Sequence, residues 1–195
     1  MTDEYLTIKG ESSGTYTELR SKFLSFAFPV RTVEEAMALV DKFQRKYFDA
    51  RHVCWAYMLG AERETFRAND NGEPSGTAGK PILGQINSKG LTDIIILVVR
   101  YFGGVKLGTS GLISAYRTAA AEAISAAEII SKTVDAECHF SFEYPMLSGV
   151  MKVVRDMDAR ILKQDFGMQC NLTLSIRRGK KEELTEKINK ALSPF

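Results

Sequence analysis

Residues 94–112 read IIILVVRYFGGVKLGTSGL, an apolar run followed by a glycine-rich segment with two cations. The run from Ile94 to Val99 has no polar face, which predicts a central strand covered on both sides. Beyond it, Gly103 and Gly104 permit backbone conformations and close approaches that a Cβ would prevent. Thr109 or Ser110 is expected to cap a following helix. The segment therefore predicts a buried strand, a glycine loop and a helix in direct succession.

The glycine loop has the chemistry of an anion site, because Arg100 and Lys106 lie beside the free N–H groups of a helix start. It differs from the common nucleotide-binding motifs. A P-loop requires Lys directly after its second glycine, whereas Lys106 precedes Gly108. The dinucleotide fingerprint Gly-x-Gly-x-x-Gly does not occur in the loop either. An anion site of another kind and a purely structural strand-to-helix connection both remain open.

Composition narrows the class of protein. The chain has 195 residues, 45% of them hydrophobic, which is enough for one large core or two small ones, and we expect two. No apolar run approaches the roughly 18 to 20 residues of a membrane span, and residues 1–11 do not resemble a signal peptide, so we expect a cytoplasmic protein without a membrane partner. Cys54, Cys138 and Cys170 form no Cys-x-x-Cys pair and the chain has only two histidines, so we expect no disulfide framework, no metal site and no cofactor.

Charge is unevenly distributed although the formal net charge is only +2. Between Ser75 and Arg117 there are five basic residues against Asp93 alone, together with eight of the fifteen glycines. Cations among exposed backbone amides can attract anions without making the whole protein basic. A solvated surface is the alternative interpretation of this patch.

Hydrophobic periodicity and end signals predict the elements of the first two thirds of the chain. Thr32-Val33-Glu34-Glu35 is a capping box at the start of an amphipathic helix. Residues 69–81 are rich in turn formers, which predicts a long loop with a function. The expected elements are a strand over 20–30 with Leu24, Phe26 and Phe28 on one buried face, a helix over about 33–47, hairpin strands over 52–59 and 64–67, a short helix over 82–87 and a helix after Gly108.

A second set of patterns begins near residue 132. Apolar residues at every second position from Val134 to Phe142 predict a half-buried strand. A helix opened by Pro145, a hairpin with Cys170 on its apolar face and a last helix through Leu192 follow. The order β-α-β-β-α is most of a ferredoxin-like unit. We therefore expect an α+β protein with domains at 1–131 and 132–195.

Four segments occur in a fixed order along the chain: Ser21-Lys22-Phe23, His52-x-Cys54-Trp55-Ala56-Tyr57, Asp70-x-Gly72-Glu73-Pro74-Ser75-Gly76-Thr77-Ala78-Gly79-Lys80-Pro81 and Arg100-Tyr101-Phe102-Gly103-Gly104-Val105-Lys106-Leu107-Gly108. Together they resemble the IMPACT/YigZ family in its compact two-domain bacterial form. The resemblance implies an IMPACT-type N-terminal domain similar to the second domain of a small-subunit ribosomal protein. It also implies a ferredoxin-like C-terminal domain similar to the last domain of elongation factor G.

The resemblance also implies a function, since eukaryotic IMPACT relatives regulate translation under amino-acid starvation. We expect a non-enzymatic binding protein that contacts RNA, the ribosome or a translation factor. The alternative is a small-molecule enzyme acting on a phosphorylated or otherwise anionic ligand, clamped by Lys80, Arg100 and Lys106 at the two glycine-rich loops. Ser75 and Ser110 lie in no Gly-x-Ser-x-Gly motif, so no complete catalytic set can be assembled. The oligomeric state stays open.

Both glycine-rich loops supply the candidate site. Asp70 and Glu73 are a possible acid pair or partners for Arg100, because a cation at the end of an apolar strand must reach solvent or find a partner. Trp55, Tyr57 and Tyr101 stack on bases or belong to the core, and Phe102 and Cys54 are expected in the core. The candidate anion- or nucleic-acid-binding residues are Ser75, Gly76, Thr77, Lys80, Arg100, Tyr101, Gly103, Gly104, Lys106, Gly108, Thr109 and Ser110.

Overall fold

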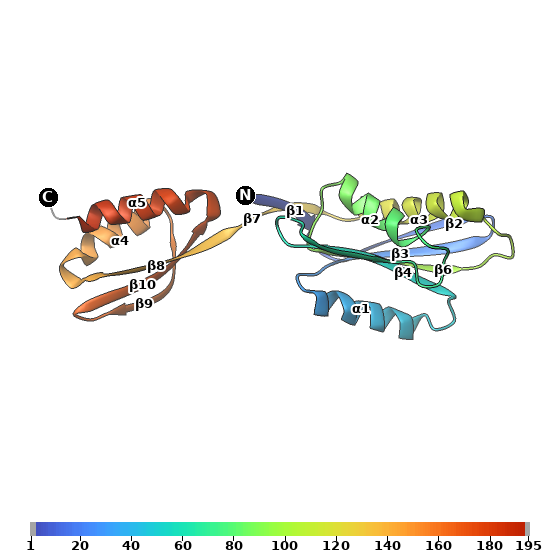
Figure 1. Cartoon of the computed structure of the whole chain (residues 1–195), viewed down its shortest axis with the longest axis horizontal. Helices are drawn as coiled ribbons and strands as arrows, with labels where there is room; N and C mark the ends of the chain where they lie inside the picture. The colour runs from blue at the N-terminus through green and yellow to red at the C-terminus, as the bar shows by residue number, and fades with distance from the viewer. Residues whose placement is uncertain (1–2, 194–195) are drawn as a thin grey trace. The chain divides into compact units, whose positions relative to one another are not determined.

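A computed structural model describes residues 3–193, and the chain forms two compact units (Figure 1). One unit comprises residues 5–132. The other comprises the chain from Thr133 onward together with Asp3 and Glu4. Asp3 belongs there because its carboxylate accepts hydrogen bonds from the Arg177 side chain and the Gly179 N–H. Strand β1 (Glu4–Ile8) pairs with β7 (Ile129–Thr133) in a separate two-stranded sheet.

A five-stranded antiparallel sheet organises the unit of residues 5–132. Its strand order is β2-β3-β6-β4-β5. The strands are β2 (Ser12–Glu18), β3 (Ser21–Pro29), β4 (His52–Leu59), β5 (Thr65–Asn69) and β6 (Ile94–Tyr101). The apolar run forms the central strand β6, and every residue from Ile94 to Arg100 is buried. The predicted central strand is therefore confirmed.

Helices cover both faces of this sheet (Figure 1). Helix α1 (Val33–Lys46) packs on one face, and α2 (Gly79–Ser88) and α3 (Gly108–Ser125) pack on the other. Because both faces are covered, the predicted single buried face of the strand over 20–30 is wrong. Phe23 is buried on the α3 side of β3, whereas Phe26 packs among the α1 residues.

Of the predicted caps of α1 and α3, only that of α1 is confirmed. Thr32 caps α1 as predicted, since its Oγ1 accepts a 3.2 Å hydrogen bond from the Glu35 N–H. The predicted cap of α3 is wrong. That helix begins at Gly108, which has φ of 74°, and no side chain caps it, so Thr109 and Ser110 lie inside its first turn.

The second unit is a three-stranded antiparallel sheet with order β8-β10-β9 and two helices that share one core with it. Figure 1 shows α4 and α5 on the same face of this sheet. The element order is β-α-β-β-α, as the periodicity predicted. Its elements are β8 (Asp135–Glu143), the 3-10 turn η1 (Tyr144–Met146), α4 (Leu147–Asp156), β9 (Arg160–Phe166), β10 (Gln169–Arg177), the 3-10 turn η2 (Arg178–Lys180) and α5 (Lys181–Leu192).

Candidate functional site

Strand register places three side chains in one row at the end of the sheet. Arg100 at the end of β6 lies directly opposite Phe23 of β3 and His52 of β4. Directly paired residues of antiparallel strands share a face of the sheet. This face is the one covered by α2 and α3, because Val98 and Cys54, two positions inward, pack in that core. The sheet therefore presents a cation beside an imidazole and an aromatic ring.

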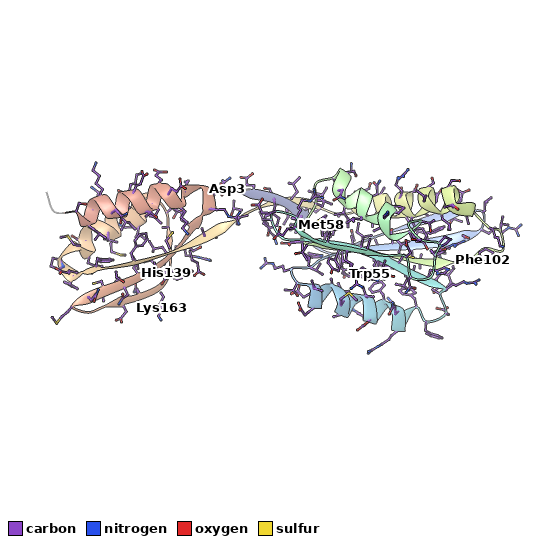
Figure 2. The ribbon with its side chains drawn as sticks, viewed as in Figure 1. Asp3, Trp55, Met58, Phe102, His139 and Lys163 are labelled. Carbon is purple, nitrogen blue, oxygen red and sulfur yellow. The ribbon has the colours of Figure 1, made fainter. Side chains whose placement is uncertain are left out.

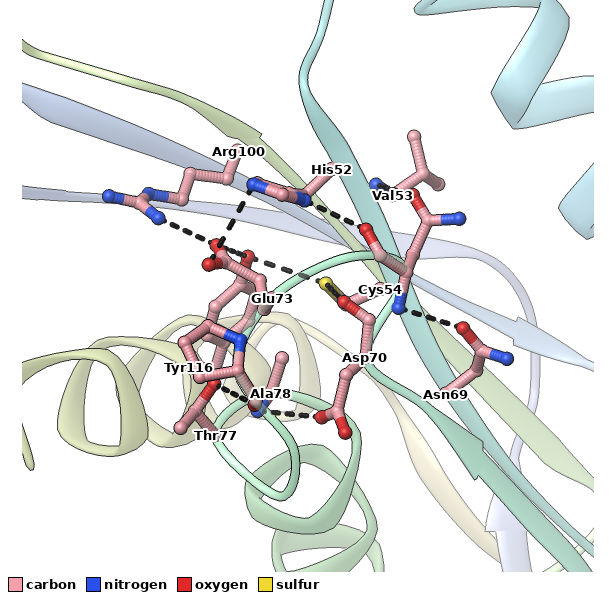
Figure 3. Close-up of polar contacts among 12 residues, drawn as sticks. His52, Val53, Cys54, Asn69, Asp70, Glu73, Thr77, Ala78, Arg100 and Tyr116 are labelled. Atoms are coloured by element: carbon pink, nitrogen blue, oxygen red, sulfur yellow. Dashed lines mark hydrogen bonds and ion pairs between the residues drawn. The ribbon is translucent and has the colours of Figure 1, made fainter. Parts of the chain in front are cut away.

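Glu73 from the loop after β5 lies against this row (Figure 3). Its Oε1 accepts 2.7 Å hydrogen bonds from Arg100 Nη1 and from the Tyr116 hydroxyl of α3. Its Oε2 lies 3.7 Å from His52 Nε2. Only 3% of the Glu73 side chain and 8% of the Arg100 side chain are exposed. Of the two predicted carboxylate partners of Arg100, the structure selects Glu73, and the pair joins the long loop to the end of β6.

Asp70 has a different role, because it closes the long loop on the start of α2 (Figure 3). Its Oδ1 accepts hydrogen bonds from the N–H groups of Ala78 (3.0 Å) and Gly79 (2.8 Å), and its Oδ2 accepts one from Gly76 (2.8 Å). Burial works to raise the pKa of Asp70, but these N–H groups and the charge of Lys80 hold it below its ordinary value. An internal carboxylate thus already occupies the N-terminus of α2. The helix also begins three residues before the predicted position.

His52 is held in a defined orientation. Its Nδ1 lies 2.7 Å from the carbonyl oxygen of Asn71, and since a carbonyl only accepts, Nδ1 carries the proton that it donates. The Asn71 side chain in turn accepts a hydrogen bond from the Val53 N–H. The remaining ring nitrogen, Nε2, faces Glu73.

Cys54 and Tyr116 complete the buried side of the site. The Cys54 Sγ lies 3.0 Å from the Asp70 carbonyl oxygen, the nearer acceptor for its single proton, and 3.4 Å from the Tyr116 hydroxyl oxygen. Burial raises the pKa of the thiol and that of the Tyr116 phenol. Both groups therefore stay protonated at neutral pH. Cys54 is a core thiol, as its sequence context predicted, and Tyr116 acts as a hydrogen-bond donor to Glu73.

A cleft of about 480 Å³ opens beside this network. The long loop and the glycine loop both line it, so the structure brings the two predicted loops together. The start of β4 and the first turns of α3 supply the remaining walls. The lining residues are Arg51, His52, Gly72, Glu73, Pro74, Arg100, Phe102, Lys106, Leu107, Gly108, Thr109 and Leu112.

Only part of the predicted site lines this cleft. Arg100, Lys106, Gly108, Thr109 and Glu73 do. Nine candidates lie outside the lining: Ser75, Gly76, Thr77, Lys80, Tyr101, Gly103, Gly104, Ser110 and Asp70. Ser75, Gly76 and Thr77 belong to the turn that Asp70 closes on α2, and Lys80 lies in the first turn of that helix. The N–H groups at this helix start already have Asp70 as their acceptor. Tyr101 packs with the α1 side of the sheet and donates its hydroxyl to Asp49.

Gly103 is required by packing. A Cβ there would lie 2.1 Å from the carbonyl carbon of Arg20 in the β2–β3 turn. Its N–H donates to the Ser21 hydroxyl at 3.2 Å. The glycine loop is therefore tied to the β2–β3 turn by a backbone contact that no other residue permits. Gly104 contributes a left-handed backbone conformation, with φ of 92°.

The sequence interpretation missed Arg51 and misplaced Phe102. Phe102 was expected in the core, but it is 48% exposed, and its ring centroid lies 5.7 Å from Arg100 Cζ. Figure 2 shows Phe102 at the end of the sheet and Trp55 within the unit. Trp55 and Tyr57 are buried in the α1 core, so neither can stack on a ligand. The aromatic surface of the cleft comes from Phe102, which no periodic pattern marks.

The cleft is cationic overall. Arg51, Arg100 and Lys106 line it together with one carboxylate, Glu73. The N-terminal turn of α3, which no side chain caps, adds N–H groups to the same wall. Residues 3–193 contain no group of three His, Cys, Asp or Glu side chains placed to hold a metal ion. Nor do they contain a helix long and apolar enough to span a membrane.

The comparisons with known proteins agree with the motifs. The sequence model of the Impact N-terminal domain matches residues 19–124, which include both loops of the cleft. The chain belongs to the IMPACT family. Its relatives include the IMPACT family members YigZ of Escherichia coli and YvyE of Bacillus subtilis. YigZ is 33% identical over 171 residues, covering 87% of this chain and 84% of YigZ.

YvyE is 33% identical over 156 residues, covering 80% of this chain and 72% of YvyE. A solved structure, titled only as that of an hypothetical protein, is 30% identical to this chain. It superimposes with a TM-score of 0.74 over 97% of this chain and 93% of its own. Family membership therefore extends over both units of the chain.

Proposed function

We propose that this protein binds single-stranded RNA through the cleft between the two loops, as part of a role in translation. The observation that carries the proposal is the position of the exposed cations Arg51 and Lys106 beside the half-exposed ring of Phe102. Proteins that bind single strands combine cations for the backbone with an aromatic surface for a base. The cleft has both within one concave surface.

The cations can contact phosphates without being neutralised by the protein. Arg51 and Lys106 have no ion pair within the described residues, and the single carboxylate of the lining, Glu73, is already bonded to Arg100 and Tyr116. Phosphate contacts of this kind supply most of the affinity for RNA without reading its sequence. We therefore expect binding that depends strongly on salt and weakly on sequence.

The role in translation is supported by the family. Eukaryotic IMPACT relatives regulate translation, and the resemblance likens the two domains of this chain to domains of a small-subunit ribosomal protein and of elongation factor G. The β-α-β-β-α order of the second unit agrees with a ferredoxin-like domain that lacks its last strand. On this proposal the RNA partner belongs to the ribosome or to a complex of a translation factor.

A second candidate, an enzyme acting on a phosphorylated ligand, is favoured by one observation. His52 lines the cleft with Nδ1–H held by the Asn71 carbonyl, which is how a general base is oriented. Turnover of mononucleotides followed by ³¹P NMR tests it. Loss of turnover in His52→Gln would establish the enzyme, whereas a complete absence of turnover in the wild type removes it.

The binding test uses fluorescence anisotropy of a labelled single-stranded RNA over a range of salt concentrations. Arg51→Ala and Lys106→Ala should each weaken binding similarly for all sequences and lower the salt slope by about 0.7 per lost contact. Lys42→Ala and Arg45→Ala, exposed cations of α1 on the opposite face of the sheet, are the matched controls. Unchanged slopes in folded cleft variants contradict the proposal.

A further inference from the structure

Arg100 is a buried cation of the cleft with incomplete hydrogen bonding. Its guanidinium is almost wholly buried, and the rings of Phe23 and Phe102 both lie 5.7 Å from Cζ. Within the described residues its only hydrogen-bond acceptor is Glu73, which takes Nη1, and its buried Nε has none. A buried donor without an acceptor costs free energy, more so on a charged group. Since Arg100 also lines the cleft, an anion bound there can supply an acceptor to the part of its guanidinium that faces the cleft.

The net charge of the cleft indicates the chemical class of the anion that it would bind. The three lysine and arginine cations and the one carboxylate of the lining together carry a net charge of +2. An internal phosphodiester carries one negative charge. A phosphomonoester carries about −1.5 to −2 at pH 7 and offers three acceptor oxygens. The monoester matches the charge, and its oxygens can also accept hydrogen bonds from the N-terminus of α3, which no side chain caps.

The size and shape of the cleft agree with a single nucleotide. Its volume of about 480 Å³ is that of sites that enclose one small molecule. Phe102 lies next to Arg100 and leaves half of its surface exposed. A nucleotide with its phosphate at Arg100 can therefore place its base against the exposed part of that ring.

We propose that the cleft recognises a nucleotide phosphomonoester, which is the phosphorylated end of an RNA strand. This inference rests on the proposed RNA binding and adds to it a preference for a terminal phosphate over internal ones. Arg100 and the α3 N-terminus hold the phosphate, Lys106 and Arg51 balance its second charge, and Phe102 stacks the terminal base. The same chemistry can come from a 5′ end, a 3′ end or a free mononucleotide.

Competition binding distinguishes these sources. The full-length protein, bound to a labelled RNA, is titrated with unlabelled octamers of one sequence that carry a 5′-phosphate, a 3′-phosphate or hydroxyls at both ends, and with AMP. One phosphorylated octamer should compete at least about tenfold better than the hydroxyl octamer, because one additional charge-assisted hydrogen bond supplies such a factor. Lys106→Ala should reduce this ratio several-fold, and Lys42→Ala should leave it unchanged. Both residues are exposed, so both variants should fold.

The possible results separate the two proposals. Equal competition by all three octamers, with binding still dependent on Lys106, refutes recognition of a phosphomonoester and leaves the RNA-binding function intact. Failure of the labelled RNA and of every octamer to bind refutes the RNA-binding function itself. If AMP competes and no octamer does, the cleft recognises the phosphomonoester of a free mononucleotide and not that of an RNA end. A phosphate preference that persists unchanged in both Lys106→Ala and Phe102→Ala places recognition outside this cleft and overturns the inference.

Discussion

Removing one partner of the buried ion pair of Glu73 and Arg100 should strongly destabilise the unit of residues 5–132. Glu73→Ala removes the acceptor of both Arg100 Nη1 and the Tyr116 hydroxyl, each at 2.7 Å. Breaking a buried pair while leaving its charge in place costs about 3–5 kcal/mol, a large part of the about 5–15 kcal/mol that stabilises a typical protein. We expect the free energy of unfolding to fall by about this amount.

Two further variants separate charge from hydrogen bonding. Glu73→Gln keeps an oxygen acceptor for both donors and loses only the charge, so its cost should be about 1–3 kcal/mol. The double variant Glu73→Leu with Arg100→Met replaces the pair by apolar side chains. It should cost much less than the sum of the single changes, because no charge is left unpaired.

Urea unfolding followed by tryptophan fluorescence provides the measurement. Trp55 is the only tryptophan of the chain and is buried in the α1 core, so the signal reports on the unit that contains the pair. The reasoning is refuted if Glu73→Ala lies within about 1 kcal/mol of the wild type. A coupling energy below about 0.5 kcal/mol in the double-mutant cycle refutes it equally.

Four other predictions follow from single contacts. Gly103→Ala should destabilise the protein by more than the about 1–3 kcal/mol of ordinary overpacking, because the added Cβ would clash with backbone atoms. Gly84→Ala, at an open position of α2, should instead raise stability by about 0.4–1 kcal/mol in the same urea assay. Ionised Asp70 stabilises the fold, since its pKa is lowered in the folded state. The difference in unfolding free energy between the wild type and Asp70→Asn should therefore be full at pH 7 and decrease below about pH 4. A difference that stays constant down to pH 3 would count against this role. Cys54 and the other two cysteines, all buried, should resist thiol reagents at pH 8 until the chain unfolds; labelling of the native protein would be the contrary result. Limited proteolysis should cut first near residue 132 and yield two folded fragments, and earlier cleavage elsewhere would show that the predicted boundary is wrong.

Sequence patterns correctly predicted the strands and helices that depend on residues close together in the sequence. The apolar run of β6 had to be covered on both faces, and Thr32 had to cap α1, because periodicity and capping involve neighbours in sequence. Strand β2, with the sequence SSGTYTE, was not predicted since it has no apolar alternation. It exists because the edge of β3 pairs with it and because Gly14 allows close contact with α3, where a Cβ would lie 2.6 Å from that of Glu122.

Part of the candidate site could likewise be predicted from the sequence, and the rest depended on the tertiary fold. The chemistry of Arg100 required a partner, and the two nearby carboxylates of the long loop were the correct choices to consider. Their separate roles depended on how that loop folds, because Asp70 meets the N–H groups of α2 while Glu73 turns toward Arg100. Phe102 was misplaced because exposure depends on what covers a residue, which one-dimensional periodicity does not encode.

The sequence by itself determined the family, the buried central strand, the two glycine-rich loops and the presence of a cation at the end of β6. These properties depend on residue type and on spacing along the chain. Only the tertiary structure decided that His52 and Phe23 flank Arg100 and that Arg51 lines the same cleft as Lys106. Strand register and helix packing make those neighbours, and both arise from contacts between residues far apart in sequence, so no local pattern could specify them.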